Sequence, residues 1–209
     1  MRVSSPTSWR TCVIRGRRRS RLHDVESLDA LTNDAREWAR GRTWWPRALL
    51  LVYLAYAVIR FLRDPFSSTM FSGITLAFHE MGHVIFSFAG HFIGSLMGSG
   101  MQVLIPVAVI VIFFRQEDYF GMSVGGFWLS FSLFELANYV GDARTMELPL
   151  VALSAGDPEH DWNYLLGVMH MLPLDHVLAL LLRLIATATG IASFGFAVWL
   201  LLTMARSRR

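Results

Sequence analysis

Long apolar runs dominate the sequence after residue 43 and constrain its fold more than any other feature. Five such runs cover about 46–63, 69–95, 99–114, 120–140 and 177–204. Of the 209 residues 54% are hydrophobic, and the mean hydropathy is +0.42. A helix that crosses the hydrocarbon of a bilayer needs roughly 20 apolar residues. Because only helices and closed barrels pair every backbone polar group there, the pattern predicts an all-α polytopic membrane protein with about five apolar helical segments.

The N-terminal region, 1–43, differs in character from the membrane domain that we expect over 44–209. Residues 1–47 hold 11 Arg against 5 acidic residues, whereas 48–209 hold 8 Arg against 11. This basic charge ahead of apolar spans favours acidic lipid head groups or other membrane subunits as partners, and not nucleic acid. An apolar stripe at spacings of three and four predicts an amphipathic helix over 24–40. Its positions are Val25, Leu28, Leu31, Ala35 and Trp38.

The distribution of arginine also predicts how the chain is oriented. Cytoplasmic segments of membrane proteins carry an excess of basic residues, so we expect the N-terminus in the cytoplasm of a multi-pass protein of the bacterial inner membrane. The C-terminal sequence ARSRR favours the same side. Five crossings would leave the two ends on opposite sides. We therefore expect one re-entrant segment, within 95–114 or 162–172.

The second apolar run contains the motif HExxH, formed by His79, Glu80 and His83. On a helix, positions i and i+4 lie on one face, so the two imidazoles can bind one metal ion, for which we expect zinc. Glu80 can then act as general base toward a water on that ion. A metal ion would also explain how these polar groups are held in an apolar segment, where they are otherwise unfavourable.

The third metal ligand is open in the sequence. A catalytic zinc site has three protein ligands and a water molecule. The candidates are His160, Asp161 and Asp175. We expect His160 first, because HDWN (160–163) is the densest polar cluster before an apolar helix, predicted over 162–172. Asp161 is the alternative from the same cluster, although it can instead be the N-cap of that helix.

Other polar residues are weaker candidates for the site. His91 follows His83 by eight residues, about 80° around a helix, and is less suited as a ligand. His91 or Asn163 can stabilise an oxyanion. Glu135 lies inside a predicted span, where an ionisable group is a functional candidate, and its alternative role is a pair with Arg183.

The motifs resemble two groups of membrane proteins. FHEMGH within an apolar segment is similar to the site-2 protease group of intramembrane zinc metalloproteases. In that group an Asp ligand follows Pro and Leu in a later motif; Pro173, Leu174 and Asp175 are similar, with His176 in place of the usual Gly. The motifs HEMGHVIF, YVGDAR and HDWNYLLG also resemble small bacterial membrane proteins that are distantly related to those proteases, in which HDWN is the partner of HExxH.

These observations lead to two functional hypotheses. The first is a membrane-embedded zinc metallohydrolase, a peptidase, in which zinc on His79, His83 and His160 carries a water that Glu80 deprotonates. The second is a non-enzymatic accessory subunit of a multi-subunit membrane complex, respiratory or photosynthetic, that retains a metalloprotease-like metal site and binds other subunits through its N-terminal tail. The intact motif favours the enzyme, and the small size of the chain favours the subunit.

Overall fold

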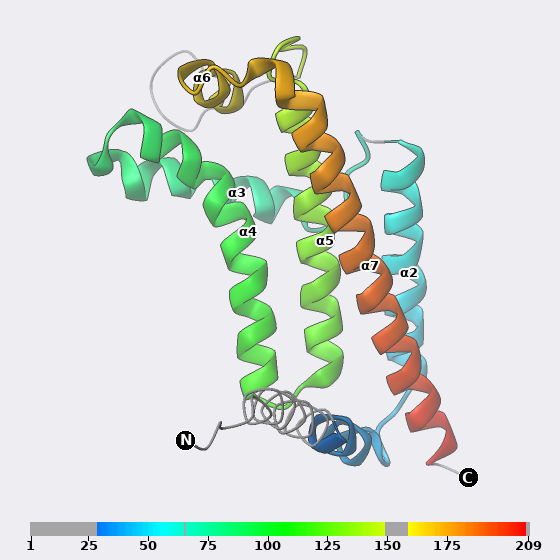
Figure 1. Cartoon of the computed structure of the whole chain (residues 1–209). Coiled ribbons are helices and arrows are strands. Elements are labelled where there is room, and N and C mark those ends of the chain that lie inside the picture. The colour runs from blue at the N-terminus through cyan, green and yellow to red at the C-terminus, as the bar shows by residue number, and fades with distance from the viewer. Residues whose placement is uncertain (1–28, 65, 149–158, 208–209) are drawn as a thin grey trace, which may run out of the picture.

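The fold is all-α, as predicted. The structure, a computed structural model, describes residues 29–64, 66–148 and 159–207, which contain helices and no strand (Figure 1). After a helix over 29–39, the helices are α2 (Trp45–Arg63), α3 (Ser72–Phe86), α4 (His91–Arg115), α5 (Tyr119–Gly141), α6 (Asp161–Val168) and α7 (Asp175–Arg206). Two short 3₁₀ turns, Ser87–Ala89 and Leu172–Leu174, precede α4 and α7.

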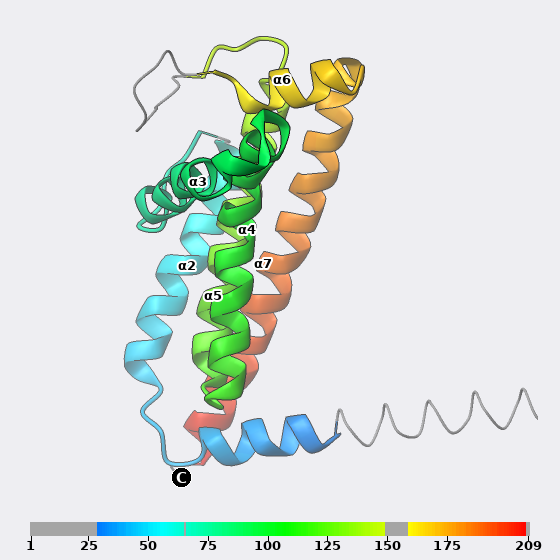
Figure 2. The ribbon, with the colours of Figure 1, turned by 90° about the vertical axis from the view of Figure 1, so that its left-hand side faces the viewer.

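Four of the described helices are long and apolar enough to cross a membrane, so the expected count of five is wrong by one. The candidate spans are Trp45–Arg63, His91–Arg115, Tyr119–Gly141 and Leu172–Arg206. They run side by side along the long axis of the molecule (Figures 1 and 2). The run 69–95 does not form one helix, because the chain turns at Gly90, whose φ of +90° is accessible chiefly to glycine.

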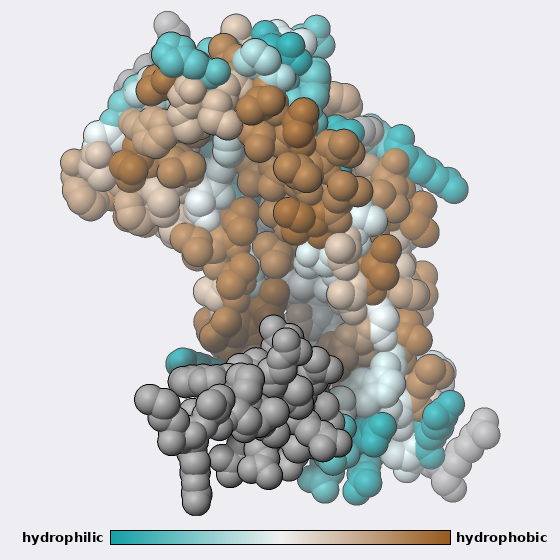
Figure 3. Space-filling model, viewed as in Figure 1, coloured by the Kyte–Doolittle hydropathy of each residue, from teal (hydrophilic) through white to brown (hydrophobic). Residues whose placement is uncertain are grey.

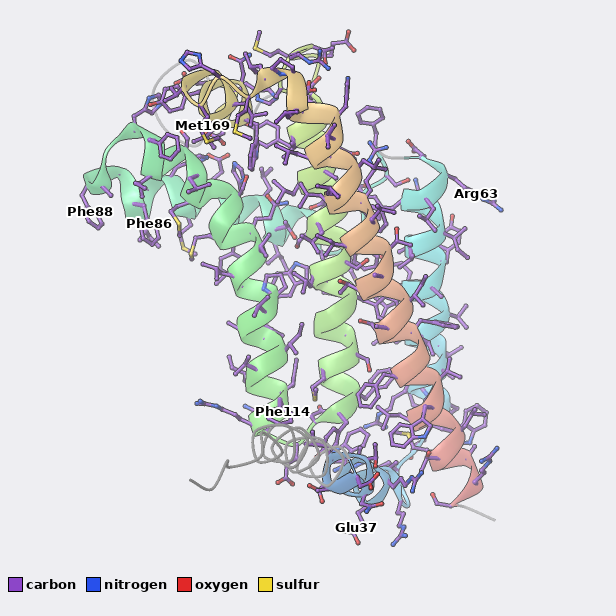
Figure 4. The ribbon with its side chains drawn as sticks, viewed as in Figure 1. Glu37, Arg63, Phe86, Phe88, Phe114 and Met169 are labelled. Atoms are coloured by element: carbon purple, nitrogen blue, oxygen red, sulfur yellow. The ribbon has the colours of Figure 1, made fainter. Side chains whose placement is uncertain are left out.

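The segment that falls short of a span is α3, with 15 residues, and not a segment within 95–114, which forms most of α4. α3 runs across the direction of the long helices and then turns back into α4, forming a hairpin (Figures 1 and 2). Phe86 and Phe88 lie at the outer end of this hairpin and point away from α6 (Figure 4). Since Phe88 is 85% exposed, the hairpin presents an apolar tip outside the bundle.

α5 is the central helix of the bundle. In its most apolar 18-residue stretch 78% of residues are buried, against 22–28% in the other three candidate spans. Its residues Phe131 and Phe134 stack on Phe61 of α2, and Asp118 caps its first turn by accepting from the N–H of Gly121. On the face that Figure 3 shows, apolar residues cover much of the middle of the molecule, and hydrophilic residues gather toward its two ends.

The described part of the amphipathic helix, 29–39, packs against its own chain. Ala35 and Ala39 are buried, and the ring of Trp38 meets Tyr119 edge-on at 5.9 Å between centroids. The N–H of Gly41 donates to Ser207 Oγ at 3.3 Å, so this helix and the end of α7 share one end of the bundle. The stripe positions Val25 and Leu28, and the tail that we expect to bind other subunits, lie outside the described residues.

Candidate metal centre

The HExxH residues lie on α3, on the face that meets α4. Ligand atoms of His79, Glu80 and His83 all fall within 4.8 Å of one another, and the two imidazole centroids are 4.9 Å apart. His79 and Glu80 are buried, and His83 is half-buried. The expectation that the two histidines share one helix face is confirmed.

Asp161, at the start of α6, joins the two histidines. Its Oδ2 atom lies 3.1 Å from His79 Nε2 and 3.2 Å from His83 Nε2. Zinc bonds of about 2.0 Å in a tetrahedral site place neighbouring ligand atoms about 3.3 Å apart. The distances from Asp161 Oδ2 to the two imidazole nitrogens are therefore close to the distance between two ligand atoms of a tetrahedral zinc ion.

The second nitrogen of each imidazole faces a hydrogen-bond acceptor. His79 Nδ1 lies 3.2 Å from Gln102 Oε1, and the amide of Gln102 is oriented by its own donation to the carbonyl of Ser132 at 3.0 Å. His83 Nδ1 lies 3.0 Å from the carbonyl oxygen of Gly94. Each Nδ1 is thus placed to donate to its acceptor, and Nε2 is the nitrogen of each ring that faces Asp161.

This arrangement places negative charge and lone pairs against one another. Burial acts to raise the pKa of Asp161, and hydrogen bonds with His79 and His83 lower it to about 2 where each Nε2 carries a proton to donate. Where both Nδ1 atoms carry protons, the contacts at Nε2 require either a second proton on each ring or a cation between the rings and the carboxylate. A divalent metal ion supplies the same charge as the two protons.

Several contacts hold α6, and with it Asp161, over α4 and α5. The hydroxyl of Tyr139 donates to Asp161 Oδ2 at 3.3 Å and accepts from the Asp161 N–H at 3.0 Å. Trp162 Nε1 donates to Ser99 Oγ on α4 at 3.0 Å. Asn163, which we considered for oxyanion stabilisation, donates instead to a backbone carbonyl at 2.7 Å.

His160, the first choice for third ligand, lies away from the histidine pair. Its Nδ1 accepts from the N–H of Asn163 and caps α6, a role that we had considered for Asp161. Its Nε2 lies 3.3 Å from Asp142 Oδ2. Burial lowers the pKa of His160, and its ring is tilted against that of Tyr139 with centroids 4.3 Å apart. Both ring nitrogens of His160 thus face residues other than His79 and His83, and we now prefer Asp161 as the third ligand.

Asp175 and His91 are engaged elsewhere. Asp175 is completely buried and accepts from Arg144 Nε and from the N–H of His176, both at 2.6 Å. His91 is exposed, and its Nε2 lies 3.0 Å from Glu159 Oε2. Both residues therefore contact groups other than His79 and His83, and we do not assign either of them as a metal ligand.

Glu135 does not pair with Arg183, contrary to the alternative drawn from the sequence. Glu135 accepts from Ser72 Oγ at 2.5 Å, at the beginning of α3. Arg183 donates to Asn138 Oδ1 at 2.9 Å. Glu135 therefore anchors the start of the helix that carries the motif.

Two glycines allow α3 and α4 to approach closely at the site. A Cβ atom at Gly82, the fourth residue of the motif, would overlap the carbonyl oxygen of Met97. A Cβ atom at Gly98 would lie 2.5 Å from His83 Nε2 and 3.0 Å from His79 Nε2. The backbone of Gly98 thus forms one wall of the site.

A polar stripe along α5 and its C-cap residue supports the site, and the sequence motifs alone did not reveal it. The stripe consists of Trp128, Ser132, Glu135, Tyr139 and Asp142. Spacings of four and three place these residues on one helix face. Trp128 Nε1 donates to Thr75 on α3 at 2.9 Å, and the other four contact Gln102, Ser72, Asp161 and His160. The spacing of these polar residues by three and four positions, within an otherwise apolar span, is the sequence pattern that could have predicted the stripe.

No family model, curated protein or solved structure matches the chain. The resemblance to the site-2 proteases therefore stays a hypothesis, carried by the quoted motifs.

Proposed function

We propose that this membrane protein is a zinc-dependent hydrolase, most simply a peptidase, with the metal held by His79, His83 and Asp161. The observation that carries the proposal is the convergence of His79 Nε2 and His83 Nε2 on Asp161 Oδ2 within 3.2 Å, with each Nδ1 facing an acceptor. Two histidines and one carboxylate are a ligand set used by hydrolytic zinc sites.

The chemistry follows from this ligand set and from Glu80. A zinc ion held by His79, His83 and Asp161 would supply Lewis acidity toward a water molecule and a substrate carbonyl. Glu80 is buried, and one of its carboxylate oxygens lies within 4.8 Å of the imidazole ligand atoms. Its carboxylate accepts the proton of the attacking water and returns it to the leaving amine. The elements of water are thereby added across one amide bond.

The test compares the wild-type protein with Glu80→Gln, which keeps the ligands but cannot take a proton. Both proteins are reconstituted in lipid with a complex peptide mixture, and new peptide termini are counted by mass spectrometry at equal zinc content. We expect new termini with the wild type and a loss of at least about a hundredfold with Glu80→Gln. Identical termini in both samples would reject the hydrolase and leave the accessory subunit as the better account.

The location that we propose is the bacterial inner membrane, with the N-terminus in the cytoplasm. The net charge of +6 over 1–47, from 11 Arg and 5 acidic residues, supports this orientation. The helix 29–39 and Ser207 share one end of the bundle, which agrees with an even number of crossings. The lipid bilayer is then one partner, and subunits bound through the N-terminal region 1–43 are the partner that the accessory-subunit alternative requires.

A further inference from the structure

A cavity separate from the candidate metal centre lies between the C-terminal end of α5 and the N-terminal end of α7. Its volume is about 620 Å³, and neither the HExxH residues nor Asp161 lines it. This volume falls within the range of small-molecule sites, roughly 300–1,000 Å³. The wall includes the polar residues Arg183, Asn138 and Glu147, with Phe66 and Leu180 as apolar neighbours.

Arg183 is the unusual member of this wall. It is the one charged residue of α7 between His176 and Arg206, and it lies within the candidate span Leu172–Arg206. Among the described residues it forms no ion pair, and it donates a hydrogen bond to the neutral side chain of Asn138. A guanidinium has five N–H donors, and an ionisable group at membrane depth commonly marks a binding site. Its remaining donors suit an anionic oxygen group.

The negatively charged residues of the wall lie closer to the end of the bundle than Arg183 does. Arg183 follows the first residue of α7, Asp175, by eight residues, which places it about 12 Å along the helix axis. Glu147 is exposed and belongs to the segment after the end of α5. Asp142 adds a second carboxylate to the wall. Hydrogen bonds from Thr145 and from the N–H groups of Glu147 and Leu148 lower the pKa of Asp142, although burial opposes them.

Apolar surface continues along α7 beyond Arg183, away from the start of the helix. Leu184, the next residue, is 58% exposed. From this apolar surface toward the start of α7, the protein therefore offers hydrocarbon contacts, one cation and, past the exposed Leu180, carboxylates. An amphiphile that fits has acyl chains, a phosphate and an ammonium group in the same order.

We propose that this cavity binds the head group of a zwitterionic, amine-bearing phospholipid such as phosphatidylethanolamine. Arg183 receives the phosphate through charge-assisted hydrogen bonds, and Glu147 receives the ammonium group. The carboxylates of Glu147 and Asp142 disfavour a head group that is only anionic. This site is independent of the proposed hydrolase and requires no metal.

The test measures lipid binding to the purified full-length protein in detergent by native mass spectrometry. The probes are short-chain phosphatidylethanolamine, short-chain phosphatidylglycerol and inorganic phosphate. We expect the wild type to prefer phosphatidylethanolamine about tenfold or more, since one hydrogen bond to a charged group is worth roughly that factor. Arg183→Gln should reduce this binding about tenfold, whereas the control Arg206→Gln, at the other end of α7, should leave it unchanged.

Glu147 is exposed, so its substitution by Gln should leave the fold intact. Glu147→Gln should lower phosphatidylethanolamine binding and bring phosphatidylglycerol to equal affinity, because a repelling carboxylate is removed. Equal binding of both lipids by the wild type, or no effect of Arg183→Gln, would overturn the proposal. Displacement of the lipid by inorganic phosphate at similar concentration would also overturn it, assigning the cavity to the free ion.

Discussion

Gly98 lies directly against the Nε2 atom of His83. A Cβ atom at this position would be 2.5 Å from that nitrogen, which is closer than any van der Waals contact. The backbone of α4 therefore occupies the space beside the proposed metal position, and only a residue without a side chain fits there. Gly94, one turn earlier, has no atom within 4 Å of its own virtual Cβ.

These two glycines give the first prediction. Gly98→Ala should lower zinc affinity by at least about tenfold, because the methyl group displaces His83 Nε2 from its position beside Asp161. Gly94→Ala should leave the affinity unchanged, since its carbonyl oxygen still accepts from His83 Nδ1. The affinities are measured by competition with a chromogenic chelator. Equal affinities in the two variants would contradict the assignment of Gly98 to the wall of the site.

The second prediction concerns the identity of the third ligand. The wild type should contain about one zinc ion per chain, while His79→Ala and Asp161→Ala should lose it. His160→Asn should keep the metal, because Asn is also a favourable N-cap and preserves the start of α6. The measurement is metal content by inductively coupled plasma mass spectrometry, with size-exclusion elution as the control for folding. Metal retained in Asp161→Ala and lost in His160→Asn would restore the order expected from the sequence.

The third prediction concerns Tyr139 as a residue that positions Asp161. Tyr139→Phe keeps the ring against His160 but removes the hydroxyl that bonds to the Asp161 side chain and N–H. Loss of such a partner typically lowers metal affinity by about 10–100-fold. Tyr164→Phe is the control, since Tyr164 contacts His91 through its ring. The chelator competition assay compares the two, and a Tyr139→Phe protein with wild-type affinity would remove this role.

The fourth prediction separates Asp175 from the metal site. Asp175→Asn weakens buried hydrogen bonds with Arg144 and the N–H of His176, so the protein should lose about 1–3 kcal/mol of stability. Its zinc content should not change. Thermal unfolding in detergent and metal analysis of the same sample check both statements. Loss of zinc from the folded variant would return Asp175 to the ligand set implied by the resemblance to site-2 proteases.

The sequence by itself determined the elements whose causes are local. The apolar runs 46–63, 120–140 and 177–204 correspond to α2, α5 and α7 within one or two residues. Apolar length specifies such helices because backbone groups in hydrocarbon must pair within the segment. Helical pitch alone places His79 and His83 on one face, whatever surrounds them. These features depend on neighbours in the chain and could be predicted without the fold.

Tertiary structure decided the features that depend on contacts between distant residues. The turn at Gly90 divides one continuous apolar run into α3 and α4, since composition is the same on both sides and only the backbone at one residue differs. The choice of Asp161 over its neighbour His160 depends on how α6 docks, because adjacent residues at a helix start point in different directions. The contacts of Ser99 and Tyr139 set that docking, and they join residues far apart in sequence. Local periodicity carries no information about such pairings, so only the packed structure could place the carboxylate beside the two imidazoles.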